Sequence, residues 1–144
     1  MTTTSTAPRK RESTVYADTF FFLASINHND AHHARAIDFS ARFDGELVTS
    51  EMVLVETANA LASVSARKAY VELEAALRGD SRVRVVPTTA AINARALDLY
   101  SRANGKDWSL TDCVSFIIMS DERLVMALTG DVRFEQAGFT AVLK

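Results

Sequence analysis

Hydrophobic residues recur along this chain in two alternating patterns, short unbroken runs and longer stretches with helical spacing. The short runs predict about five strands, at residues 14–17, 46–49, 83–86, 124–128 and 140–143. The longer stretches predict helices at residues 19–25, about 29–43, about 51–64, 66–78, about 89–103, 109–120 and 131–136. Strands that alternate with helices form βα units, so the pattern predicts an α/β protein with a mainly parallel sheet covered on both faces.

Residue types at the ends of these segments predict where several helices begin and end. Ser50 is a favourable N-cap for the third helix, and Asn29 or Asp30 is expected to start the second. Gly79 is expected at the C′ position of the helix at 66–78, where a glycine tolerates the left-handed backbone that often ends helices.

Length and composition indicate one domain. The chain has 144 residues, of which 48% are hydrophobic, enough for a sizeable core. Residues 1–13 are rich in Thr and Ser and predict a disordered tail before a domain at 14–144. The single cysteine, Cys113, excludes an internal disulfide and a cysteine-based zinc site, and it favours a reducing, cytoplasmic setting. No apolar run approaches the roughly 20 residues that cross a bilayer, so no membrane contact is expected.

The charge balance disfavours one class of function. The formal net charge is −2, whereas a protein that simply coats nucleic acid is usually basic overall. A nuclease remains compatible with this balance, because a metal-dependent site needs acidic residues of its own.

Four acidic residues interrupt apolar runs, where a carboxylate is costly. They are Asp18 in VYADTFFFLA, Glu56 in MVLVETANALA, Asp112 in WSLTDCVSFIIM and Asp131 directly after LVMALTG. A buried carboxylate must be paired, protonated or bound to a metal. Neither Glu56 nor Asp112 has a Lys or Arg three or four residues away, so no ion pair within a helix explains them.

Each acid also has a purely structural interpretation. Asp18 could cap the helix after the first strand, and Asp131 could cap a short helix or lie in a turn. Asp112 could close a capping box with Ser109, and Glu56 could pair with a distant Arg. These alternatives remain open for each residue taken alone, but the four acids together lie where a βα fold could bring them to one place.

If the four acids converge, their chemistry limits what they do. Several carboxylates in one pocket cannot all ionise without a counter-charge. Oxygen ligands without His or Cys favour Mg²⁺ or Mn²⁺ over zinc. Such ions bind phosphates and activate water, so the pattern is typical of phosphodiester hydrolysis.

Four stretches of the chain together resemble the PIN-domain family, and within it the VapC-type toxins of bacterial toxin–antitoxin pairs. These stretches are VYADTFFFLA, TSEMVLVETANAL, DWSLTDCVSFIIM and ALTGDVRFEQAGF, and they span roughly residues 14–143. The resemblance implies a three-layer α/β/α sandwich and a Mg²⁺- or Mn²⁺-dependent endoribonuclease that hydrolyses RNA. It also implies a homodimer and a small cognate antitoxin that binds over the site.

The resemblance assigns roles to particular residues. The acidic quartet of the family falls on Asp18, Glu56, Asp112 and Asp131, with supporting hydroxyls at Thr19 and Thr129. The first three acids are expected to bind metal, and the fourth is expected to bind a second metal or to orient the attacking water. Two alternatives remain: a structure-specific DNA nuclease or phosphatase on a similar acidic site, and a non-catalytic protein-interaction module whose acids only cap helices.

Other polar residues carry weaker signals. His28 and His32 have the spacing of zinc-binding helices but lack a third ligand of that kind nearby, so a structural role is favoured. Trp108 is expected to pack beside the helix that carries Asp112. Basic residues that could contact RNA phosphates are expected instead to lie on solvated faces; these are Arg67, Lys68, Arg78, Arg82 and Arg84.

Overall fold

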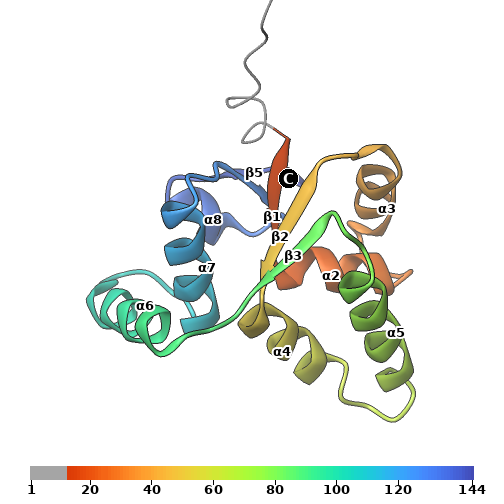
Figure 1. The fold of residues 1–144 in the computed structure, drawn as a ribbon, viewed down its shortest axis with the longest axis horizontal. Coiled ribbons are helices and arrows are strands. Elements are labelled where there is room, and N and C mark those ends of the chain that lie inside the picture. The colour runs from red at the N-terminus through yellow and green to blue at the C-terminus, as the bar shows by residue number, and fades with distance from the viewer. Residues whose placement is uncertain (1–12) are drawn as a thin grey trace, which may run out of the picture.

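The computed structural model describes residues 13–144, which form a five-stranded sheet covered by helices on both faces (Figure 1). The predicted tail lies outside the described residues, apart from Ser13. All strand pairs are parallel, in the order β3-β2-β1-β4-β5. The strands are β1 (Thr14–Ala17), β2 (Glu46–Ser50), β3 (Val83–Val86), β4 (Met126–Leu128) and β5 (Thr140–Ala141).

Seven helices connect the strands within residues 13–144. They are α2 (Thr19–Ile26), α3 (His33–Arg42), α4 (Glu51–Ala60), α5 (Arg67–Arg78), α6 (Ala90–Arg102), α7 (Leu110–Asp121) and α8 (Val132–Gln136). In Figure 1, α6 and α7 lie on one side of the sheet, and α3 and α5 lie on the other. This is the three-layer α/β/α sandwich that the sequence predicts. None of these helices has the length and hydrophobicity that a bilayer crossing requires.

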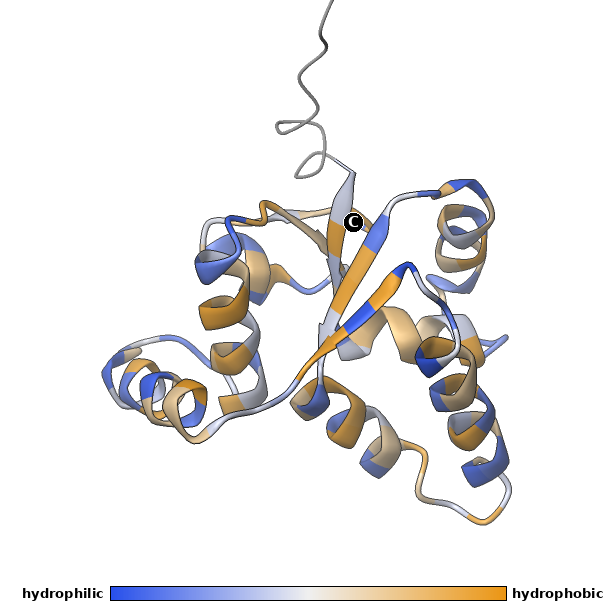
Figure 2. Ribbon diagram, in the orientation of Figure 1, coloured by the Kyte–Doolittle hydropathy of each residue, from blue (hydrophilic) through white to orange (hydrophobic). Residues whose placement is uncertain are grey.

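The central strand explains why the sheet is covered on both faces. All four residues of β1 are buried, as expected for a parallel strand between two helical layers. Hydrophobic residues also fill the middle of β2, whereas β3 is interrupted by a hydrophilic residue and the helices alternate hydrophobic and hydrophilic positions (Figure 2). The core between the layers is filled by large buried side chains such as Tyr16, Phe22, Ile118 and Phe134.

Gly45 allows the first two strands to start side by side. The amide of Glu46 donates a hydrogen bond to the carbonyl of Ser13 over 2.9 Å. A Cβ atom at position 45 would lie 1.8 Å from that same carbonyl oxygen. Any side chain there would therefore push β1 and β2 apart at their first residues, which explains why a glycine precedes β2.

Ser50 caps α4, as the sequence predicts. Its hydroxyl accepts a hydrogen bond from the amide of Val53 over 3.1 Å, and its side chain is fully buried. We expect Ser50→Ala to lower the free energy of unfolding by about 1 kcal/mol, because a buried helix amide loses its partner. Urea denaturation measures this change. The exposed Ser120→Ala is the control and is expected to stay within about 0.5 kcal/mol of the parent; equal losses in both variants would contradict the capping role.

Several predicted boundaries are wrong, each for a local reason. Helix α3 begins at His33 rather than at Asn29 or Asp30, because the Asp30 carboxylate accepts from the amide of His32 and holds a turn ahead of the helix. Gly79 ends α5 with φ −87, so it is not the predicted left-handed residue.

Three further elements are shorter than predicted. Helix α4 ends at Ala60 after 10 residues, not about 14. Strand β4 starts at Met126, because Arg123 turns the chain with φ 59 and the amide of Leu124 still bonds back to Met119 in α7. The last strand is limited to Thr140–Ala141.

Candidate functional site

Two of the four acids reach one edge of the sheet because their strands are neighbours. Ala17 of β1 and Leu128 of β4 are register partners in a parallel pair, so the residues after them leave the sheet together. The Thr129 hydroxyl donates to Oδ2 of Asp18 over 3.0 Å. The same hydroxyl accepts from the amide of Asp131 over 3.0 Å. A buried threonine therefore links Asp18 to the backbone of Asp131.

The other two acids come from helices that start at the same edge. Asp112 lies in the first turn of α7, and Glu56 lies in the second turn of α4, which directly follows β2. One pocket is lined by all four predicted acids together with Thr19, Phe20, Asp107, Ser109 and Arg133. The structure thus brings the predicted quartet together. Thr19 also borders the pocket, but its hydroxyl donates to the carbonyl of Val53 over 3.5 Å and so joins α2 to α4.

Some of the structural interpretations hold alongside this convergence. Asp112 and Ser109 form the reciprocal capping box, and Asp131 caps α8 by accepting from the amide of Arg133. Asp18 occupies the N-cap position of α2 but makes no side-chain capping bond there. Glu56 has no ion-pair partner within 4.0 Å among residues 13–144. Capping therefore accounts for part of the geometry of Asp112 and Asp131, and for none of Asp18 or Glu56.

Burial and the charges of neighbouring carboxylates raise the pKa of Asp18 and of Asp112. Burial, then the charge of Asp112, raises the pKa of Asp18 to about 7, although hydrogen bonds from Thr129 and the Thr19 amide oppose the shift. Burial also raises the pKa of Asp112, against the hydrogen bonds from Ser109, and the charge of Asp131 adds to the increase. A cation bound among these carboxylates would favour their charged forms and so lower the pKa of both Asp18 and Asp112.

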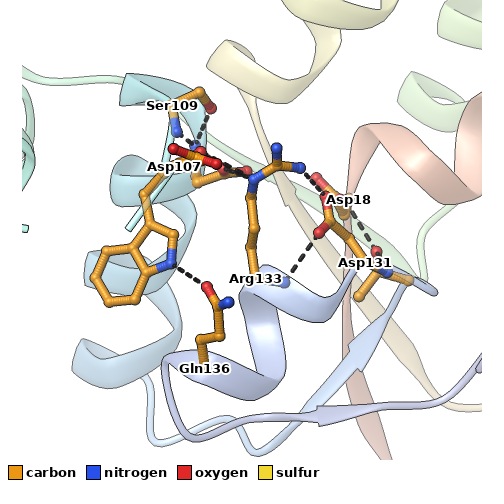
Figure 3. Close-up of polar contacts among 9 residues, drawn as sticks. Asp18, Asp107, Ser109, Asp131, Arg133 and Gln136 are labelled. Atoms are coloured by element: carbon orange, nitrogen blue, oxygen red, sulfur yellow. Dashed lines mark hydrogen bonds and ion pairs between the residues drawn. The ribbon is translucent and has the colours of Figure 1, made fainter. Parts of the chain in front are cut away.

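Arg133 is a residue of this pocket that the sequence pattern does not single out. Its Nη1 lies 3.0 Å from Oδ2 of Asp131, its Nε lies 3.9 Å from Oδ2 of Asp112, and Nε also donates to the carbonyl of Asp107. Figure 3 shows this guanidinium lying between Asp131 and the segment that carries Asp107 and Ser109. The only sequence signal for it is its position two residues after Asp131, on a helix that starts at the site.

The ligands available in the pocket fit a hard divalent cation. Its anionic groups are all carboxylates, and neither histidine nor cysteine lines it. As they stand, no three acidic, histidine or cysteine side chains in the described part of the chain are arranged to hold an ion. Oδ2 of Asp112 accepts a hydrogen bond from the amide of Ser109, and the two carboxylate oxygens of Asp131 accept from the amide and the guanidinium of Arg133.

The family follows from comparison with known proteins. The model of the PIN domain matches residues 15–140, nearly the whole chain. The chain is a PIN-domain protein. All four pocket acids of this PIN-domain protein lie within the matched residues.

Two comparisons connect this PIN-domain protein to the same relative. It is 32% identical, over 89% of this chain and 97% of the relative, to VapC20 of Mycobacterium tuberculosis, named a 23S rRNA-specific endonuclease. The crystal structure of that VapC20, described as a toxin that cleaves the sarcin–ricin loop, superposes with a TM-score of 0.82 at 31% identity, covering 89% of this chain and 98% of that one.

More distant structures share the fold alone. FitAcB from Neisseria gonorrhoeae has a TM-score of 0.61 at 17% identity, covering 88% of this chain and 95% of that one. VapBC2 from Rickettsia felis, solved with a DNA fragment from its promoter, has a TM-score of 0.60 at 14% identity, covering 85% and 91%.

The other polar side chains that the sequence singles out do not line the acidic pocket. Trp108 packs edge-to-face on Phe116 with ring centroids 5.0 Å apart. His33 bonds to the carbonyl of Ala24, and its ring lies 4.7 Å from that of His28. Burial, then the charge of Asp112, raises the pKa of the Cys113 thiol to about 11, so the thiol stays protonated near neutral pH. Arg78, Arg82 and Arg84 pair with acids on the surface.

Proposed function

We propose that this PIN-domain protein is a metal-dependent endoribonuclease that hydrolyses RNA phosphodiester bonds and acts as the toxin of a toxin–antitoxin pair. The observation that supports the proposal best is the convergence of Asp18, Glu56, Asp112 and Asp131 on one pocket. Burial, then the charge of Asp112, raises the pKa of Asp18 there to about 7, and such perturbed carboxylates are typical of functional sites.

Mg²⁺ or Mn²⁺ is the proposed cofactor. Asp18, Glu56 and Asp112 would hold it, directly or through water, and Asp131 would hold a second ion or orient the attacking water. When bound, such an ion lowers the pKa of water and stabilises the negative charge that develops on the phosphate oxygens.

The surrounding residues prepare the carboxylates for this task. The Thr129 hydroxyl fixes one oxygen of Asp18 and is itself fixed by the backbone amide of Asp131. The amide of Ser109 fixes Oδ2 of Asp112 through the capping box. Because these bonds come from rigid helix and strand ends, the carboxylates are held in place before substrate binds.

The substrate and partners are proposed from the relative. VapC20 is named for cleavage of 23S rRNA, and the match covers nearly both chains, so we propose a structured ribosomal RNA as substrate for this protein. We also propose a small cognate antitoxin protein that covers the acidic pocket, and a homodimer as the working state. A ribosomal substrate would place the protein in the cytoplasm.

Comparing substrate classes tests the proposal. The purified protein is incubated with a labelled RNA stem-loop, a DNA of the same sequence and a simple phosphomonoester, each in MnCl₂ and in EDTA. We expect cleavage of the RNA within the chain, only with the metal. Preferential cleavage of the DNA or the monoester would replace the proposal with the alternative nuclease or phosphatase, and no metal-dependent cleavage of any substrate would favour the interaction module.

A further inference from the structure

Arg133 makes contacts that its helix does not require. Helix α8 has only five residues, and Oδ1 of Asp131 already caps it by accepting from the backbone amide of Arg133. That bond needs no guanidinium. The side chain instead extends to Asp131 at the start of its own helix and to Asp112 and the carbonyl of Asp107 at the start of α7, so it links two segments around the pocket.

The position of the guanidinium conflicts with a cation among the carboxylates. Its Nη1 holds Oδ2 of Asp131 at 3.0 Å, and its Nε lies 3.9 Å from Oδ2 of Asp112. A divalent cation bound to these carboxylates repels a guanidinium so close to it. The side chain is 41% exposed and long, so it is free to rotate toward solvent when the cation takes over its partners.

We propose that Arg133 exchanges partners in the active site: it neutralises Asp131 and Asp112 in the metal-free protein and binds a backbone phosphate of the RNA once the metal is in place. This inference rests on the proposed function. A guanidinium at the edge of the pocket presents a planar fork of donors that matches two phosphate oxygens. The carboxylates around Arg133 would repel the negatively charged RNA backbone. The positive charge of the guanidinium offsets that repulsion when RNA binds.

The exchange predicts opposite effects of one substitution on two ligands. We expect Arg133→Gln to bind Mn²⁺ about threefold to tenfold more tightly than the parent, because an internal competitor is gone. We expect its KM for the RNA to rise about tenfold, with kcat changed much less, because a charge-assisted phosphate contact is lost. The magnitude of the slope of log KM against log salt concentration should fall by about 0.7, the value for one phosphate contact with single-stranded nucleic acid.

The experiment uses the full chain in three variants beside the parent. Mn²⁺ affinity is measured by calorimetry without RNA, and KM and kcat are measured at several salt concentrations. Arg133→Lys keeps the charge and loses the fork, so it should recover the salt slope but only part of the KM. Arg102→Gln is the matched control, because Arg102 pairs with Asp98 on an exposed face of α6 and lines no part of the acidic pocket.

The outcomes separate this inference from the proposed function. Tighter Mn²⁺ binding together with a higher KM and a flatter salt dependence in Arg133→Gln, but not in Arg102→Gln, supports the exchange. An unchanged Mn²⁺ affinity or an unchanged salt slope overturns it, since a residue that only braces α8 would alter neither. A parent that lacks metal-dependent RNA cleavage contradicts the proposed function itself.

Discussion

Asp112→Asn is expected to reduce RNA cleavage by at least about a thousandfold without unfolding the protein. Removing one carboxylate from a metal site costs several kcal/mol of transition-state stabilisation, and each 1.4 kcal/mol is about tenfold in rate. The fold survives because the asparagine carbonyl oxygen can still accept from the amide of Ser109, as Oδ2 of Asp112 does now. The measurement is the single-turnover rate on the RNA stem-loop in MnCl₂.

The matched control for Asp112 is Asp98→Asn. Asp98 is also a helical aspartate, but it is exposed and pairs with Arg102 far along α6. We expect this variant to cleave at the parent rate. A similar rate in Asp112→Asn, with normal unfolding, would show that the capping box is the whole role of Asp112.

Asp18→Asn is expected to make the metal-free protein more stable near pH 8. The pKa of Asp18 is raised to about 7 in the folded protein, above its ordinary value of 3.8. Between these two values the folded state binds more protons than the unfolded state, so the free energy of unfolding falls as pH rises from about 4 to 7. Because about three pKa units separate the two states, the loss amounts to about 2–4 kcal/mol and is complete above about pH 7.

The test compares parent and variant at both ends of this pH window. Urea unfolding in EDTA at pH 4.5 and pH 8 should show that Asp18→Asn lacks most of the loss seen in the parent. Adding MgCl₂ at pH 8 should then stabilise the parent more than the variant, since only the parent keeps the full set of ligands. A variant less stable than the parent at pH 8 in EDTA would contradict a repelling acidic site.

Much of the fold can be predicted from the sequence because βα units leave strong local patterns. The fully buried β1 reads as an unbroken run, and the cap at Ser50 marks the start of α4. Errors arise where side chains hold turns rather than helices, as at Asp30, and where a residue such as Arg123 turns the chain ahead of a strand. At these positions the local sequence is compatible with a turn and with a continued helix or strand, and tertiary packing decides between them.

The site is predictable in part for a similar reason. A carboxylate in an apolar run is costly, so Asp18, Glu56, Asp112 and Asp131 stand out in the sequence. Arg133 does not, because a charged residue on a short polar helix is normally solvated. Its role depends on contacts to Asp107 and Asp112, more than 20 residues away in sequence, and only the fold brings these together.

The central claim is that these acids serve catalysis rather than structure, and Glu56 tests it most directly. Asp112 and Asp131 hold helix ends, and Asp18 bonds to Thr129, whereas Glu56 has neither a capping role nor an ion pair within residues 13–144. Its replacement should therefore leave the fold unaffected.

The decisive measurement is the single-turnover rate of RNA cleavage in MnCl₂ by Glu56→Gln, with its urea midpoint measured in parallel. The account predicts a rate at least about a hundredfold below the parent at an unchanged or higher midpoint, because a metal ligand is lost but no structural contact is. A parent-like rate in this variant would contradict the assignment of Glu56, and with it the interpretation of the four carboxylates as one catalytic site.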